Sequence, residues 1–194
     1  MSRTAAPTGL QQMTVARAME VHAELAKLRD EKIIRFIGVT AHGYFDKALG
    51  LIESDGFDLC MLAYGYLPRG HDQRFSPRTV ALREKCLAKA HELKMGIVAM
   101  KVIGAGVMGA WAPYVVPKFD RKRTGLLPAA AIRYALQDKR IHMLCIGMRL
   151  RTEIDANIKT LAGDTTYTQA DQELMGDFGP EALKSEAMKK MKVE

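Results

Sequence analysis

A chain of 194 residues can bury a substantial core, and its 48% hydrophobic and 26% charged residues match a water-soluble globular protein. No apolar run approaches the roughly 18 residues that span a bilayer, and residues 1–9 lack the apolar stretch of a secretory signal. We therefore expect a cytoplasmic protein with no membrane partner. The 29 Lys and Arg exceed the 22 Asp and Glu, which favours anionic ligands. No aromatic residues interleave with the basic clusters, so nucleic acid is not the expected partner.

The chain alternates between two kinds of segment. A helical period over 11–30 comes first. Four short apolar runs then have the length of buried strands, at 33–40, 57–64, 96–102 and 141–147. Helical periods follow them, at 45–53, 77–93, 126–136 and 151–161. A short helix over 172–178 and a Lys-rich end complete the chain.

This alternation predicts an α/β fold with a parallel sheet, because continuous apolar strands are typical of strands that helices cover. We expect a leading tail and helix over 1–30, four βα units over 31–162 and a helical tail over 163–194. Four such units form half of a TIM barrel, whose two strand edges would be exposed. Self-association or a missing N-terminal half is expected to complete it.

The cysteines and histidines are too scattered for a metal site or a disulfide framework. Cys60 and Cys145 lie in apolar runs, and we expect both to be buried and structural. No nucleophile elbow of the G-x-S-x-G type is present, which argues against a hydrolase. Function in a βα fold lies in the loops after the strands, so the loops 41–43, 65–76, 103–125 and 148–151 are the places to search.

Three segments carry a family resemblance: 33–42 (IIRFIGVTAH), 96–106 (GIVAMKVIGAG) and 145–157 (CIGMRLRTEIDAN). In this order and spacing they resemble the second half of the aldo/keto reductase superfamily, strands five to eight of its barrel. The resemblance implies an NADP(H)-linked oxidoreductase that acts on small carbonyl compounds. It also implies a set of cofactor-binding residues, which are Thr40, Tyr64, Lys101, Gly104, Gly106, Arg149, Arg151, Glu153 and Asn157.

Within that set the two ends differ. Thr40 and Ala41 stand where the family has a Ser-Asn pair, and an alanine cannot replace the amide. Gly104 and Gly106 would let backbone amides approach a pyrophosphate, and Arg149 and Arg151 would add charge-assisted hydrogen bonds. The alternatives without a ligand are that the two glycines only form a turn and that the two arginines are ordinary surface charges. The resemblance thus predicts a weakened nicotinamide end and a better phosphate end.

The family's catalytic Asp, Tyr, Lys and His belong to the first four strands, and no matching segment occurs here. The catalytic group is therefore unknown, with His42, Tyr64 and Lys101 as candidates at strand ends. Tyr66 and His71 lie near the same edge, and His71 is expected to be solvated. Two alternatives to an enzyme stay open: a module that binds NADP(H) or another phosphate ligand without turnover, and a half-barrel interaction protein.

Overall fold

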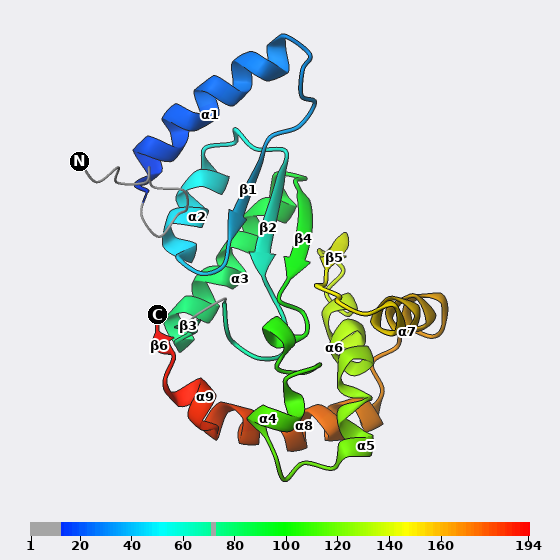
Figure 1. Ribbon diagram of the computed structural model, residues 1–194. Coiled ribbons are helices and arrows are strands. Elements are labelled where there is room, and N and C mark those ends of the chain that lie inside the picture. The colour runs from blue at the N-terminus through cyan, green and yellow to red at the C-terminus, as the bar shows by residue number, and fades with distance from the viewer. Residues whose placement is uncertain (1–12, 71–72) are drawn as a thin grey trace, which may run out of the picture.

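The computed structural model describes residues 13–70 and 73–194 (Figure 1), so His71 and residues 1–12 lie outside the described residues. Four strands form one sheet in the order β1-β2-β4-β5, and every neighbouring pair is parallel. Their bounds are β1 Gly38–Ala41, β2 Leu59–Ala63, β4 Gly96–Met100 and β5 Met143–Cys145. The predicted parallel α/β class is confirmed.

Five longer helices accompany these strands, and short helical turns fill the connection from β4 to β5 (Figure 1). The longer ones are α1 Val15–Asp30, α2 Phe45–Glu53, α3 Pro77–Glu92, α6 Leu127–Leu136 and α7 Arg151–Ala162. The turns are η1 Gly104–Gly106, α4 Ala112–Val115 and α5 Arg121–Thr124. The start of α3 follows from its sequence, since Ser76 Oγ accepts a hydrogen bond from the Thr79 amide at 3.2 Å and Pro77 occupies the first turn.

The two faces of the sheet differ in burial. Val39, Cys60 and Ile97 are paired across β1, β2 and β4, and all three are buried in the core with residues of α2, α3 and α6. The next residues along the strands form the row Thr40, Met61, Val98 and Met143 on the opposite face. That row is exposed or half-buried. A complete barrel would cover it, so the burial pattern is that of a partial barrel.

Both edges of the sheet carry exposed apolar residues. Ile33 and Phe36 are 66% and 61% exposed, although they lie in an apolar run predicted to be strand. At the other edge Met143 of β5 is 63% exposed. Neither α1 nor α7 has a buried residue. Edge positions are exposed here because the neighbours that would cover them are not among the described residues.

The C-terminal part is longer and more regular than predicted. Helix α8 spans Gln169–Lys184 and packs on α6, where Asp171 accepts a hydrogen bond from Arg133 Nε at 2.8 Å. Helix α9, Glu186–Lys189, leads into β6, Lys192–Val193, which pairs in parallel with β3, Gln73–Arg74. Two-residue strands have no periodicity to detect, so the sequence did not predict this pair. Within 13–70 and 73–194, no helix is both long and apolar enough to cross a membrane.

Candidate functional site

A cavity of about 850 Å³ opens at the carboxyl ends of the four strands. Its walls come from the ends of β1, β2, β4 and β5, the β4–α6 connection, and the first turns of α7. Thr40, His42, Lys101, Gly106, Trp111, Cys145, Arg149, Glu153 and Asn157 are among the lining residues. Six of the nine predicted cofactor residues are thus brought together, while Tyr64, Gly104 and Arg151 do not line it.

Lys101 directly follows β4 and has a left-handed backbone, with φ of 62°. Burial lowers the pKa of its ammonium group, and the nearby positive charge of Arg69 lowers it further. Met100 and Val102 on either side are 5% and 0% exposed, so this part of the chain is fixed by the core. Lys101 therefore offers the cavity a positioned amine that releases its proton more readily than an ordinary lysine.

The glycines of the next loop serve as turn residues. Gly104 and Gly106 have φ of 58° and 90°. Their amides donate to the carbonyls of Lys101 and Ile103, at 2.7 Å and 3.1 Å, so both are already used within the loop. A Cβ at Gly106 would lie 2.5 Å from Trp111 Cδ1. The glycine is needed there so that the indole can pack on the backbone.

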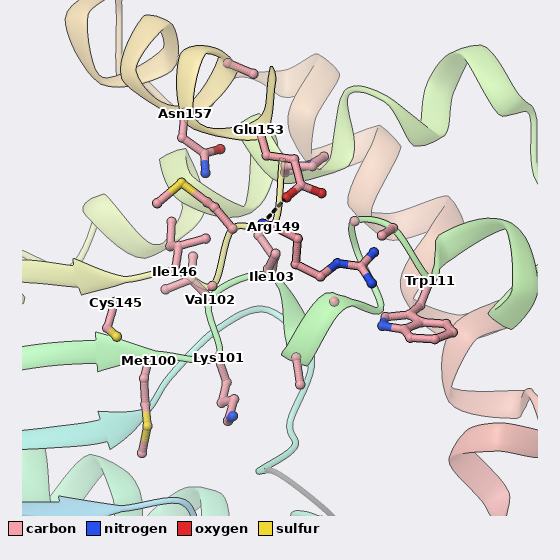
Figure 2. A pocket seen from close by; sticks show the side chains of 18 of the residues that line it. Met100, Lys101, Val102, Ile103, Trp111, Cys145, Ile146, Arg149, Glu153 and Asn157 are labelled. Carbon is pink, nitrogen blue, oxygen red and sulfur yellow. Dashed lines mark hydrogen bonds between the residues drawn. The ribbon is translucent and has the colours of Figure 1, made fainter. Parts of the chain in front are cut away.

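Trp111 and Arg149 form one wall of the cavity together (Figure 2). The guanidinium carbon of Arg149 lies 5.9 Å from the centre of the Trp111 ring, within the range of a cation–π contact. Trp111 is 52% exposed, which leaves part of its ring accessible. Sequence reasoning did not single out Trp111, because nothing local links a residue in the β4–α6 connection to the loop after β5.

The start of α7 is capped from inside the cavity. The Glu153 carboxylate accepts hydrogen bonds from the amides of Arg149, at 2.6 Å, and Leu150, at 3.1 Å, which lower its pKa. The residue at the N-cap is Leu150, and Thr152 is the second residue of the helix. Asn157 lies one turn further along and also faces the cavity (Figure 2). An anion at this helix end would meet the Glu153 charge, so positive charge must come from side chains.

The predicted catalytic candidates separate into two groups. His42 and Lys101 line the cavity. Tyr64 does not, because its ring lies under the guanidinium of Arg83 at 4.9 Å and stacks near Tyr134 at 6.5 Å between centroids. Burial strongly raises the pKa of Tyr64. Tyr66 also packs on Tyr134, with 5.4 Å between centroids.

Arg151 and Cys145 differ from expectation for reasons of position. The Arg151 side chain is 92% exposed and lies 3.9 Å from Asp155 one turn away, as a surface charge would. Cys145 is exposed and lines the cavity, so the expectation that it is buried was wrong. It ends β5, which among the described residues pairs with β4 on one side only. Cys60 is buried, as predicted.

No cluster of three or more His, Cys, Asp or Glu that could hold a metal occurs in the part of the chain that the structure describes. The cavity instead combines the Trp111 ring, the cations of Lys101 and Arg149, the Asn157 amide and the Glu153 carboxylate. Such a mixture on a largely apolar surface suits an organic ligand that carries both rings and anionic groups.

Comparison with known proteins rests on structure. No protein-family model matches the chain, and no curated protein matches its sequence. An aldo-keto reductase from Bacillus halodurans in its holo form superposes with a TM-score of 0.60 at 14% identity, over 88% of this chain and 57% of that one. The apo form gives 0.54 at 13%, over 93% and 62%.

At this identity the likeness establishes the fold: a parallel α/β unit that matches part of an aldo-keto reductase structure. The chain spans less than two thirds of the length of either structure. The predicted partial barrel is confirmed.

Proposed function

We propose that this chain binds NADP(H) in the cavity and forms the cofactor-binding part of an aldo/keto-reductase-like oxidoreductase that acts on carbonyl compounds. The observation that carries the proposal is the convergence of Thr40, Lys101, Gly106, Arg149, Glu153 and Asn157 on one cavity. These residues come from the end of β1, the connection after β4, the loop after β5 and the first turns of α7. Separate surface sites would not need them to meet.

The residues present fit such a ligand in kind. A volume of about 850 Å³ lies in the range of cofactor sites. The Trp111 and Arg149 pair offers a flat surface for a ring, and Asn157 offers an amide donor and acceptor. Because Gly104 and Gly106 use their amides internally, phosphate would rely on Arg149 and Lys101.

The bound cofactor would supply hydride, and the chain's own task would be to hold the carbonyl compound and deliver a proton. Lys101 and His42 are the cavity residues suited to that task, and the lowered pKa of Lys101 favours proton release. One observation favours the alternative of a binding module without turnover. Both strand-end tyrosines considered, Tyr64 and Tyr66, pack on Tyr134 outside the cavity.

The experiment uses the chain's one tryptophan, Trp111, as a reporter inside the site. NADPH bound in the cavity should quench the Trp111 emission by energy transfer and saturate. Arg149→Leu should weaken binding about tenfold, the value of one charge-assisted contact of roughly 1.4 kcal/mol. Arg151→Leu is the matched control and should bind as the wild type does, because Arg151 does not line the cavity and its side chain is 92% exposed.

Quenching that never saturates, or equal affinities for the two arginine variants, would contradict the proposal. Turnover of simple aldehydes then separates an enzyme from a binding module. If Lys101 delivers the proton, Lys101→Met should abolish turnover while leaving energy transfer measurable. Unchanged turnover in that variant would remove Lys101 from the mechanism.

We also propose that a complementary half barrel covers the exposed edges. Within residues 13–70 and 73–194, strands β1 and β5 each pair on one side only. On α7 the residues Ile154, Ile158 and Leu161 are 42%, 59% and 50% exposed. A barrel places one helix between neighbouring strands. If a second copy completed the barrel, β5 of one protomer would lie beside β1 of the other. Both α7 of the first protomer and α1 of the second would then have to cover the junction of these two strands. A partner of four parallel strands and three helices fits instead.

Sedimentation equilibrium tests this choice of partner. The chain alone should behave as a monomer, and Ile158→Glu should leave its mass unchanged. A dimer that Ile158→Glu dissociates would overturn the proposal and favour a second copy.

A further inference from the structure

Glu194 follows β6 and contacts two segments, the start of α3 and the loop after β1. Its backbone amide donates to the Arg74 carbonyl at 2.9 Å. Its own carbonyl oxygen accepts from the Ser76 amide at 2.8 Å and from Thr79 Oγ1 at 2.6 Å. The strand pair β3 and β6 thus ends at the first turn of α3, where Glu194 closes it.

The Glu194 side chain reaches further, to the loop after β1. One carboxylate oxygen accepts from the Tyr44 amide, and the other accepts from Gln73 Nε2 at 2.9 Å. Tyr44 is the residue before α2 and has a left-handed backbone, with φ of 54°. A negative charge is favoured at the start of a helix. The Glu194 carboxylate thus binds the amide of Tyr44, whose left-handed backbone is strained and persists only where the surrounding structure holds it.

Two glycines show how closely these parts approach each other. A Cβ at Gly43 would lie 2.1 Å from Glu194 Oε2 and 2.2 Å from Gln73 Nε2. A Cβ at Gly70 would lie 1.9 Å from the carbonyl oxygen of His42. The segment from His42 to Tyr44 thus lies against Gly70, Gln73 and Glu194. His42, at the start of this segment, lines the cavity.

We infer that Glu194 is a positioning residue that fixes the His42–Tyr44 segment, and with it the His42 imidazole, at the rim of the cavity. The C-terminal segment would then act on a site to which it contributes no lining residue. Its effect on His42 stands on the contacts above. Its effect on cofactor affinity rests on the proposed function.

A double-mutant cycle with Gln73 tests the inference. In Glu194→Gln the new amide still accepts from Tyr44, but the charged oxygen that accepts from Gln73 Nε2 is replaced by a neutral NH₂ group. In Gln73→Glu two carboxylates face each other. The double variant restores one donor and one acceptor and keeps the wild-type net charge. Glu181→Gln is the control, because Glu181 is exposed and its carboxylate accepts from Lys184 Nζ of the same helix, at 3.3 Å.

The first readout needs no ligand and follows the imidazole proton resonances of His42 by NMR. The His42→Asn variant assigns these resonances, and circular dichroism checks that each sample is folded. Both single variants should move these resonances, and the double variant should return them toward the wild-type position. Glu181→Gln should leave them in place. Resonances that do not move in either single variant, or that move additively in the double variant, would overturn the inference.

The second readout is NADPH affinity by Trp111 energy transfer. Each single variant should weaken binding by about threefold to tenfold, as expected for loss of one ordinary hydrogen bond, and the double variant should recover it. If wild-type protein binds no NADPH, the proposed function fails while the His42 result still stands. If NADPH binds and all four proteins bind equally, the link from Glu194 to the cavity fails.

Discussion

The two walls of the cavity differ in how deeply their residues are buried. The β4 wall lies on the core, with Ile97, Ala99 and Val102 all at 0% exposure. The opposite wall, formed by β5 and α7, contains no buried residue in either element. Lys101 belongs to the first wall, and Arg149, Glu153 and Asn157 belong to the second.

This difference assigns the two walls different roles in binding. Residues on a packed wall are held in place before a ligand arrives, so they lose little freedom on binding. Residues on the β5 and α7 wall must be ordered by the ligand, by a partner or by local contacts such as those of Glu153. The comparison predicts that stability is concentrated in β4 and that ligand affinity is sensitive to β5 and α7.

The largest expected effect is on stability. Ile97→Ala on β4 should lower the free energy of unfolding by about 2–5 kcal/mol, because it leaves a cavity in the core. Met143→Ala on β5 should change it by less than about 0.5 kcal/mol, since Met143 is 63% exposed. Urea denaturation followed by circular dichroism measures both. Equal losses in the two variants would show that β5 is as well packed as β4, and the two walls would then not differ in packing.

The same contrast decides how far the sequence could predict this structure. The helical period over 45–53 predicts α2 at its observed bounds, and Ser76-Pro77 places the start of α3, because both signals are local. The runs that contain Phe36 and Cys145 are just as apolar, yet these residues are exposed. Burial of an edge strand depends on a neighbour, which no local pattern encodes.

The candidate site follows the same rule. Lys101, Arg149, Glu153 and Asn157 were predicted from the family resemblance of their segments, and the fold brings them to one cavity. Tyr64 was predicted from its position after β2, but Arg83 and Tyr134 hold its ring elsewhere. Trp111 and Glu194 were missed because their contacts join distant segments. Motifs predict which loops meet, and packing decides which side chains point inward.

A second, smaller effect concerns the turn that supports Trp111. Gly106→Ala should lower the free energy of unfolding by about 1–3 kcal/mol, because a Cβ is strained at φ of 90° and collides with the indole. Emission of Trp111 should shift in the folded protein, since the ring must move. Gly176→Ala is the control: a Cβ at this helical position has nothing within 4 Å. Unchanged emission in Gly106→Ala would show that Trp111 does not rest on this turn.

The smallest effect on stability, and the most direct test of the weaker wall, concerns the thiols. Burial raises the pKa of Cys60 and of Cys86 to about 12, so both should stay protonated and unreactive at pH 8 in the folded protein. Cys145 is exposed on the cavity wall and should react. A chromogenic disulfide reagent should therefore titrate one thiol in the native chain, three in denaturant, and none in native Cys145→Ser.

Saturating NADPH should slow the Cys145 reaction, because a ligand between the two walls covers the end of β5. Protection without any change in Trp111 emission would place the ligand away from the Trp111 and Arg149 pair and contradict the proposed site. Fast labelling of Cys60 or Cys86 would show that the core side opens as readily as the edge. The rate of the Cys145 reaction thus measures whether bound NADPH covers the exposed β5 and α7 wall.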